Sequence, residues 1–376
     1  MKPRQPINRR TFLRRAGGLA VGLSFVSLAG CDENTVTPRA INPVPFLNAA
    51  DRPAPEGGLY VKHGGEAGIP GWSMPDLDPA AWTLTIGGLV DTPLTVTLAD
   101  LEAEAANAVT VLKTMRCIED DNTIPGLVGT TLWRGIPLRL FLDRAGLDQD
   151  RTRRLRLFAA DGFTNNIKLD EVYRAFGPGA YEPMLVTHMN GLPLTREHGS
   201  PVRLFVHDAY GYKNVKWIER IEATDDDAVF GTYQQIIGYV DDGTMGVTSK
   251  ITAPLFNQVL PAGSVLVQGF AVSGLGAVTG VALSFDDGPF QQARLLPFDE
   301  LLAQEPMLAQ AQQALDGVPF PFASVWATWD FRWDATPGTH RIRVRATDSA
   351  GNTQPDEDRA WEDGNNAIIA VTVNVT

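Results

Sequence analysis

The chain has 376 residues, of which 44% are hydrophobic and 20% are charged, and its formal net charge is −12. These values are typical of a soluble globular protein that is long enough for two domains, each with its own core. The negative charge argues against a surface that binds nucleic acid, because such surfaces gather lysine and arginine.

The first 30 residues resemble an export signal rather than part of a fold. Arg9 and Arg10 form a twin arginine, and a weakly apolar run follows at 17–30. This run of 14 residues is shorter than the ~20 that are needed to span a bilayer. We therefore predict that residues 1–30 are a twin-arginine signal peptide, the kind that directs already folded proteins to export.

The signal ends in the sequence LAGC at 28–31, which is typical of a bacterial lipobox. We expect cleavage before Cys31 and lipidation of its thiol, and the alternative is plain cleavage near Ala29 with release of the protein. Residues 31–58 are rich in Pro, Asn, Asp and Gly, which predicts an extended tether. The expected location is the periplasmic or extracytoplasmic face of a membrane, held there by lipid.

Residues 59–246 form the first predicted domain, in which strands and short helices mix without a regular βαβ order. Apolar residues at helical spacing predict helices, and alternating apolar residues predict strands. We expect helices at 98–106 and 138–147, and strands with turns at 82–90, 154–163 and 201–224.

Residues 247–376 form the second predicted domain, where short alternating strands with turns between them indicate an immunoglobulin-like β-sandwich. The segment FDDGPF predicts a hairpin with Asp287 and Gly288 at its turn. The segment 298–317 has a helical pattern and is expected to be an insertion between strands. The predicted fold class is therefore α+β, with a mixed domain followed by a sandwich.

Cys117 is the only thiol left if Cys31 carries lipid. One thiol cannot hold an iron–sulfur cluster, which needs about four cysteines, and the C-x-x-C-H pattern of c-type haem attachment is missing from the sequence. Glu119, Asp120 and Asp121 follow Cys117 closely. Because negative neighbours disfavour a thiolate, this is a poor place for a nucleophilic cysteine.

The sequence resembles the sulfite oxidase family of molybdopterin enzymes over residues 59 to 376. That family has a cysteine followed, in order, by W-x-G-x-P-L, D-G-[YF], M-N-G-x-P-L-x-x-x-H-G-x-P-x-R and G-x-x-x-V-K-W. This chain matches with Cys117 and then with residues 133–138, 161–163, 189–203 and 211–217. The segment RATDSAGNTQP at 345–355 is similar to the family's sandwich domain.

The resemblance implies that Cys117 is the one protein ligand to molybdenum, which would explain a thiol among acids, because a high-valent metal deprotonates its thiol ligand. It implies one pterin per metal, whose phosphate is bound by arginine and lysine side chains. The residues that match the family's cofactor-binding positions are Lys62, His63, Asp161, His198, Arg203, Asn214, Val215 and Lys216. Tyr239 is the candidate for the family's active-site tyrosine.

The chain departs from the family where sulfite-oxidising members carry three arginines that hold an anion. Those positions fall at Lys62, at Asn122 and near 361–364, none of which supplies an arginine. Glu119 and its acidic neighbours would hold a divalent anion poorly. The departure leaves the substrate open.

The function expected from the sequence is two-electron oxygen-atom transfer on a small substrate at molybdenum, with electrons exchanged with an external partner, either a cytochrome or a quinone-linked membrane protein. Sulfite dehydrogenase proper and S-oxide or N-oxide reductase are the alternatives within the enzyme class. A cofactor-free binding lipoprotein on the same fold is the alternative from another class. The family's sandwich domain also suggests a homodimer.

Overall fold

The computed structural model describes residues 59–62, 72–120, 126–176, 180–309, 318, 320–358 and 362–376. All of them belong to one compact unit, Pro43–Thr376. The predicted signal peptide and tether, with Cys31, lie outside the described residues, as do His63, Asp121 and Asn122. In the described part of the chain, no helix has the length and apolar character to cross a membrane.

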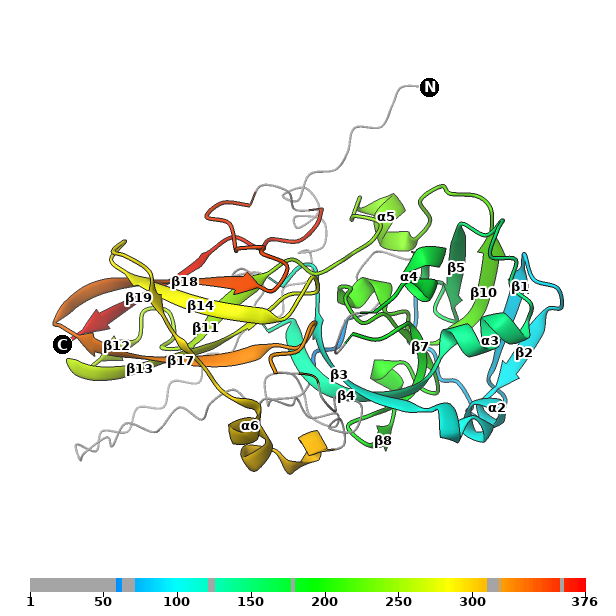
Figure 1. Ribbon diagram of the computed structural model, residues 1–376, viewed down its shortest axis with the longest axis horizontal. Helices are drawn as coiled ribbons and strands as arrows, with labels where there is room; N and C mark the ends of the chain where they lie inside the picture. Colours follow the sequence, from blue (N-terminus) through cyan, green and yellow to red (C-terminus); the bar gives the residue numbers. More distant parts are fainter. Residues whose placement is uncertain are drawn as a thin grey trace, which may run out of the picture. The chain divides into compact units, whose positions relative to one another are not determined.

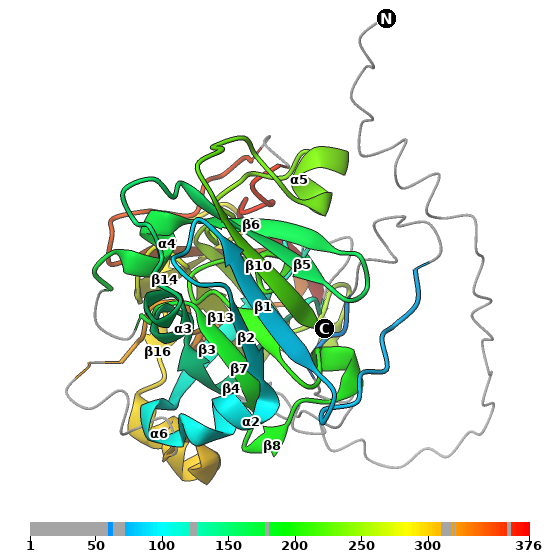
Figure 2. The same ribbon diagram turned by 90° about the vertical axis from the view of Figure 1, so that its right-hand side faces the viewer.

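Two sheets of five strands each, counted over the described residues, make up the first half (Figures 1 and 2). The first has the order β2-β1-β10-β5-β6, formed by Leu94–Thr97, Thr83–Gly88, Ile218–Thr224, Arg154–Ala159 and Thr164–Lys168. The second has the order β3-β4-β7-β8 with β9 paired to β7, formed by Val109–Arg116, Val128–Pro137, Met184–Met189, Leu192–Pro193 and Arg203–Phe205. Only β1 and β10 pair in parallel among these described strands, which confirms that the domain is not a regular βαβ fold.

Short helices connect the strands, in line with the predicted helices at 98–106 and 138–147. They are α2 (Leu98–Ala103), α3 (Leu138–Arg144), α4 (Leu169–Tyr173) and α5 (Thr232–Ile236), with 3₁₀ turns η3 (Ala105–Asn107), η4 (Arg196–His198) and η5 (Gly211–Lys213). Helix α2 begins at a capping box, in which Asp100 N–H donates to the Thr97 hydroxyl and Thr97 N–H donates to the Asp100 carboxylate.

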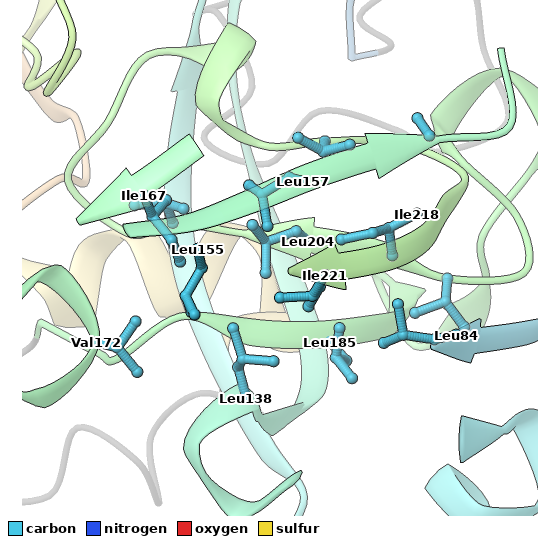
Figure 3. Close-up of a cluster of buried hydrophobic side chains, with 14 of the residues drawn as sticks. Leu84, Leu138, Leu155, Leu157, Ile167, Val172, Leu185, Leu204, Ile218 and Ile221 are labelled. Atoms are coloured by element: carbon cyan, nitrogen blue, oxygen red, sulfur yellow. The ribbon is translucent and has the colours of Figure 1, made fainter. Parts of the chain in front are cut away.

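Aliphatic side chains fill the space between the two sheets (Figure 3). Leu155 and Ile221 come from one sheet, Leu185 and Leu204 come from the other, and all four are fully buried. Figure 2 looks onto the sheet that contains β1, β10 and β5, with β7 and β4 behind it. This core fixes the loops at the ends of the strands, several of which line the candidate site.

The second half is a β-sandwich, as predicted. One sheet has the order β11-β13-β17-β16, formed by Thr248–Ala253, Gly263–Val272, Ala327–Ala335 and Arg294–Leu295. The other has the order β12-β19-β18-β14-β15, formed by Val259–Leu260, Ile369–Val375, Gly338–Asp348, Val278–Phe285 and Gln291–Gln292. Val267, Leu283, Trp329 and Val344 are among the side chains buried between them.

The hairpin between β14 and β15 forms, but its turn lies one residue earlier than predicted. Gly288 N–H donates to the Phe285 carbonyl at 2.9 Å, so Asp286 and Asp287 are the central residues. Both have left-handed φ angles, of 51° and 58°. Aspartate tolerates this conformation, and the Asp286 carboxylate also accepts a hydrogen bond from Arg341 N–H at 2.8 Å.

His340 provides a test of this turn through its pH dependence. Its side-chain hydrogen bond to Asp286 raises the pKa of the imidazole above its ordinary value. A histidine whose pKa is raised in the folded state stabilises the protein at pH values below its unfolded pKa of ~6.5. This stabilisation is lost as the pH rises through the folded-state pKa. We expect the melting-temperature difference between wild type and His340→Gln to be largest near pH 5.5 and to shrink above neutrality. A constant difference from pH 5.5 to 8.5 would contradict this.

The predicted helical insertion lies between β16 and β17 and contains α6 (Phe298–Gln304) and η6 (Pro306–Leu308), while residues 310–317 lie outside the described part. Leu301 of this insertion packs in one buried cluster with Leu112, Leu132 and Trp326. These side chains belong to both predicted domains, so β3 and β4 of the first half have one face against the second half.

Hydrogen bonds reinforce this junction. Thr114 N–H of β3 donates to the Ser324 carbonyl at 2.8 Å, and Trp326 N–H donates to the Thr114 hydroxyl at 2.7 Å. The strand that leads to Cys117 is therefore held from the side of the sandwich.

Candidate active site

One pocket, of about 750 Å³ including its open mouth, lies beside the end of β3. It gathers nearly all of the site residues that were predicted from the sequence. Those that line it are Lys62, Cys117, Asp161, His198, Arg203, Asn214, Val215, Lys216 and Tyr239. His63 and Cys31 lie outside the described residues.

Cys117 follows directly after the last residue of β3. Its N–H donates to the Leu127 carbonyl at 2.8 Å, and its carbonyl accepts from Asp120 N–H at 3.0 Å, which closes a tight turn. The thiol is buried, with 9% of the residue exposed, and burial raises its pKa to about 12. Such a thiol is a poor free nucleophile, but it becomes a thiolate when it binds a metal.

The acids after Cys117 do not all surround the thiol, which corrects the picture drawn from the sequence. Glu119 lines the pocket, but Asp120 is fully buried on the other side of the turn. There it forms an ion pair with Lys250 Nζ of β11 at 2.7 Å and accepts a hydrogen bond from Arg116 Nε at 3.4 Å. Two cations therefore compensate Asp120.

Arg116 is also fully buried and reaches the C-terminal segment. Its Nη1 donates to the Asn366 side chain at 2.7 Å, and its Nη2 donates to the Asn365 carbonyl at 3.0 Å. Arg116, Asp120 and Lys250 thus form a buried charge cluster directly behind the Cys117 turn.

Glu119 joins two other pocket residues. Its carboxylate forms an ion pair with Lys62 Nζ and accepts a hydrogen bond from the Tyr239 hydroxyl at 2.7 Å. Burial, followed by the charge of Glu119, raises the pKa of Tyr239 well above its ordinary value. Tyr239 therefore stays protonated and acts as a hydrogen-bond donor.

Arg203, the first residue of β9, forms a buried cation at the other side of the site. Its Nη1 donates to the His198 carbonyl at 3.1 Å and its Nη2 to the Asn214 carbonyl at 2.9 Å. Its Nε is buried and has no hydrogen-bond partner among the described residues. Burial lowers its pKa to about 10, so the guanidinium keeps its charge at neutral pH. An unsatisfied buried donor of this kind fits an anionic group such as a phosphate.

His198 and Lys216 lie next to Arg203. Burial, and then the charges of Arg203 and Lys216, lower the pKa of His198 to about 3, so its imidazole is neutral. Lys216 Nζ donates to the Glu197 carbonyl at 2.8 Å. Gly199 allows this close approach: its φ is +100°, and a Cβ there would lie 2.9 Å from the Lys216 Cβ.

Asn214 and Asp161 have partners within the protein. The Asn214 amide donates to the Tyr210 carbonyl at 2.9 Å and accepts from Val206 N–H at 2.8 Å, so its side chain fixes the loop that carries Val215 and Lys216. Asp161 accepts from Trp72 Nε1 at 2.9 Å and from Phe163 N–H at 3.0 Å. Each carboxylate oxygen can accept a further bond, which leaves Asp161 capacity for a donor on a ligand.

Aromatic residues that were not predicted from the sequence as site residues complete the pocket. Tyr60, Phe163, Tyr212 and Tyr233 line it, and the rings of Tyr212, Tyr233 and Tyr239 contact one another at centroid distances of 5.4 to 6.3 Å. They come from separate segments and share no motif. Only the position of Tyr212 and Phe163 inside the matched motifs could have indicated them.

Two family models match the chain. The oxidoreductase molybdopterin binding domain matches residues 71–230, and the Mo-co oxidoreductase dimerisation domain matches residues 242–363. Both matches fall near the predicted domains 59–246 and 247–376, whose bounds remain predictions.

Curated relatives include the sulfite oxidase of Gallus gallus, 26% identical over 318 residues, with 75% of this chain and 65% of the relative covered. The mitochondrial sulfite oxidase of Homo sapiens is 27% identical over 329 residues, with 75% and 55% covered. The nitrate reductase [NAD(P)H] of Hordeum vulgare is 26% identical over 368 residues, with 81% and 38% covered. The chain therefore spans less than two thirds of the length of these relatives.

Among solved structures, the chain is similar to the sulfane dehydrogenase SoxCD from Paracoccus pantotrophus. The TM-score is 0.66 at 22% sequence identity, with 89% of this chain and 85% of that chain covered. This likeness concerns the fold, and it extends over both halves of the chain.

Proposed function

Because the chain belongs to the sulfite oxidase family of molybdopterin oxidoreductases, we propose that it transfers an oxygen atom to or from a small molecule in a two-electron reaction. Written as an oxidation, the substrate and water give the oxygenated product, two protons and two electrons, and the reverse describes a reduction. The electrons pass to or from a separate carrier, a cytochrome or a quinone-linked membrane protein.

The observation that carries this proposal is the convergence of residues distant in sequence on one pocket. Cys117 supplies a buried thiol, while Arg203 and Lys216, nearly a hundred residues later, supply cations on the same pocket. A molybdenum–pterin group, when bound, would supply two-electron redox chemistry and a place for oxygen exchange. Of this chain's residues, Cys117 would hold the metal, and Arg203 with Lys216 would hold the phosphate.

The remaining pocket residues position these groups. Neutral His198 can donate one hydrogen bond without adding charge, and Asp161 can accept one from a pterin N–H. Tyr239 is a donor on the substrate side, and its hydroxyl is directed at Glu119.

The cellular setting is also a proposal. The twin arginine and the LAGC sequence support export of the folded protein and lipidation at Cys31. The match to a dimerisation domain supports a homodimer through the sandwich half.

The test of the proposed function is metal and pterin content. Protein purified from a host that makes the cofactor is expected to carry about one molybdenum and one pterin per chain, by metal mass spectrometry and by fluorescence of the released pterin. Protein from a host that cannot make the cofactor is the control. Folded protein without metal from the competent host would refute the enzyme and leave a binding lipoprotein. Tungsten at about one per chain would support the cofactor site but identify tungsten as its metal.

Arg203→Lys tests the phosphate site. Lysine keeps the charge but loses the planar fork and the Nε donor, so a buried charge-paired bond to phosphate is lost. A hydrogen bond to a charged group contributes about 1.5–3 kcal/mol, so the cofactor association constant is expected to fall by about 10- to 150-fold. Pterin retention after dialysis measures this. Arg196→Lys, a solvent-exposed arginine that is absent from the pocket lining, is the matched control and should retain wild-type pterin content.

A further inference from the structure

Glu119 lines the pocket and lies two residues after the thiol that is proposed to hold the metal. Its Oε2 pairs with Lys62 Nζ, and its Oε1 accepts from the Tyr239 hydroxyl at 2.7 Å. The Lys62 and Glu119 side chains keep 20% and 22% of their surface exposed, so both remain in reach of a small molecule that enters the pocket.

The ion pair between Lys62 and Glu119 neutralises the positive charge that could otherwise bind an anionic substrate. Lys62 and Glu119 together add no net charge, and the Tyr239 donor is directed at the carboxylate. The other cations in the pocket lining, among the described residues, are Arg203 and Lys216, which donate to the backbone carbonyls of His198 and Glu197 in η4.

Aromatic rings also line the pocket beside Tyr239. Tyr233 packs against Tyr239 with ring centroids 5.5 Å apart, and Phe163 packs against Tyr233 at 5.3 Å. Such rings offer apolar surface to an uncharged ligand, and their faces can attract a cation. Carboxylate and rings therefore favour the same kind of ligand.

We infer that Glu119 sets the charge class of the substrate, and that this substrate is an uncharged or positively charged small molecule rather than an oxyanion such as sulfite. The inference rests on the proposed function. Sulfoxides, thioethers and amine N-oxides belong to this class. Glu119 acts by repelling a second negative charge and by occupying the ammonium of Lys62, which makes it a specificity-determining residue.

The experiment compares wild type with Glu119→Gln, which keeps the shape of the side chain and removes its charge. Inorganic sulfate, a dianion that does not react, is titrated into the metal-loaded protein by calorimetry. Two unit charges ~4 Å apart in a partly exposed site interact strongly enough that we expect sulfate to bind about ten-fold tighter, or more, to Glu119→Gln. The KM for sulfite should fall in parallel, and the KM for an uncharged sulfoxide should change little.

Three further variants make the result specific. Glu222→Gln removes the same charge from an exposed ion pair with Arg220 that is not part of the pocket lining, and it should bind sulfate like wild type. Tyr239→Phe removes the hydrogen bond to Glu119 but leaves the charge of Glu119 in place, so its affinity for sulfate should not increase. Lys62→Met added to Glu119→Gln should cancel the gain, because the ammonium is the group that then receives the anion.

Equal sulfate affinity of wild type and Glu119→Gln, with both folded by thermal melting, would overturn the inference. Saturation of wild type by sulfite at the same KM as Glu119→Gln would overturn it too. Molybdenum content of the same preparations reports the proposed function separately, and sulfate binding needs no turnover. The experiment therefore distinguishes failure of the proposed function from failure of the inference about charge selection.

Discussion

Cys117→Ser is expected to lower turnover by more than about 100-fold, because even partners one shell beyond a metal ligand cost 10–100-fold in metal affinity or activity. Serine has nearly the same shape, but its oxygen is a harder ligand that suits the metal less well than a soft thiolate. The expected result is molybdenum well below one per chain, or metal present without turnover. Metal mass spectrometry and steady-state rates measure the two outcomes.

The fold should survive this change. The Cys117 turn is held by backbone bonds to Leu127 and Asp120 that do not involve the thiol, so the melting temperature of metal-free Cys117→Ser should lie close to that of metal-free wild type. Wild-type turnover in Cys117→Ser would show that the reaction does not require Cys117. A large fall in melting temperature would mean that lost activity reports unfolding instead.

Asp120→Ala is expected to lower the free energy of unfolding by about 3–5 kcal/mol, the usual cost of removing one partner from a buried ion pair. Asp120 is fully buried and compensates two cations, Arg116 and Lys250. Its Oδ1 also accepts from Leu127 N–H at 3.1 Å, which closes the turn that presents Cys117. Urea unfolding measures the loss, and metal content is expected to fall with it because the thiol is no longer held in place.

Asp225→Ala is the matched control. Asp225 pairs with Arg151 at 3.5 Å, but both side chains are more than 60% exposed, and such pairs contribute about 0–1 kcal/mol. Lys250→Met should cost less than Asp120→Ala, because Asp120 then keeps Arg116. If Asp120→Ala and Asp225→Ala had equal effects on unfolding, the buried charge cluster would not stabilise the junction.

The residues that carry motifs could be predicted from the sequence, because the segments around Cys117, His198 and Lys216 resemble motifs of a known family, and that resemblance implies their roles. The capping box of α2 could also be found, because it depends on neighbours three residues apart. Sequence cannot give contacts between distant segments, such as that of Trp72 with Asp161, because no local pattern specifies them. The same holds for the opposite directions of Glu119 and Asp120, which depend on Lys62 and on Lys250 of the other half.

The turn of the β14–β15 hairpin shows the limit of local rules. An Asp–Gly pair is the favoured hairpin signal, yet the turn uses Asp286 and Asp287. The register is decided by long-range partners, since Asp286 bonds to Arg341 N–H and pairs with His340, while Asp287 pairs with Arg341. These contacts outweigh the preference of glycine for the left-handed region.

The junction between the halves has a consequence for modularity. Leu112 and Leu132 of the first half share a core with Phe270 and Trp326 of the second, and a buried cation of the second half compensates an acid beside Cys117. A chain divided near residue 247 would expose an apolar face on each piece. It would also separate Asp120 from Lys250 and leave their opposite charges unpaired. The sandwich is therefore not an independent module. A chimera that replaces it with a relative's sandwich would also have to replace the face of β3 and β4 that packs against it.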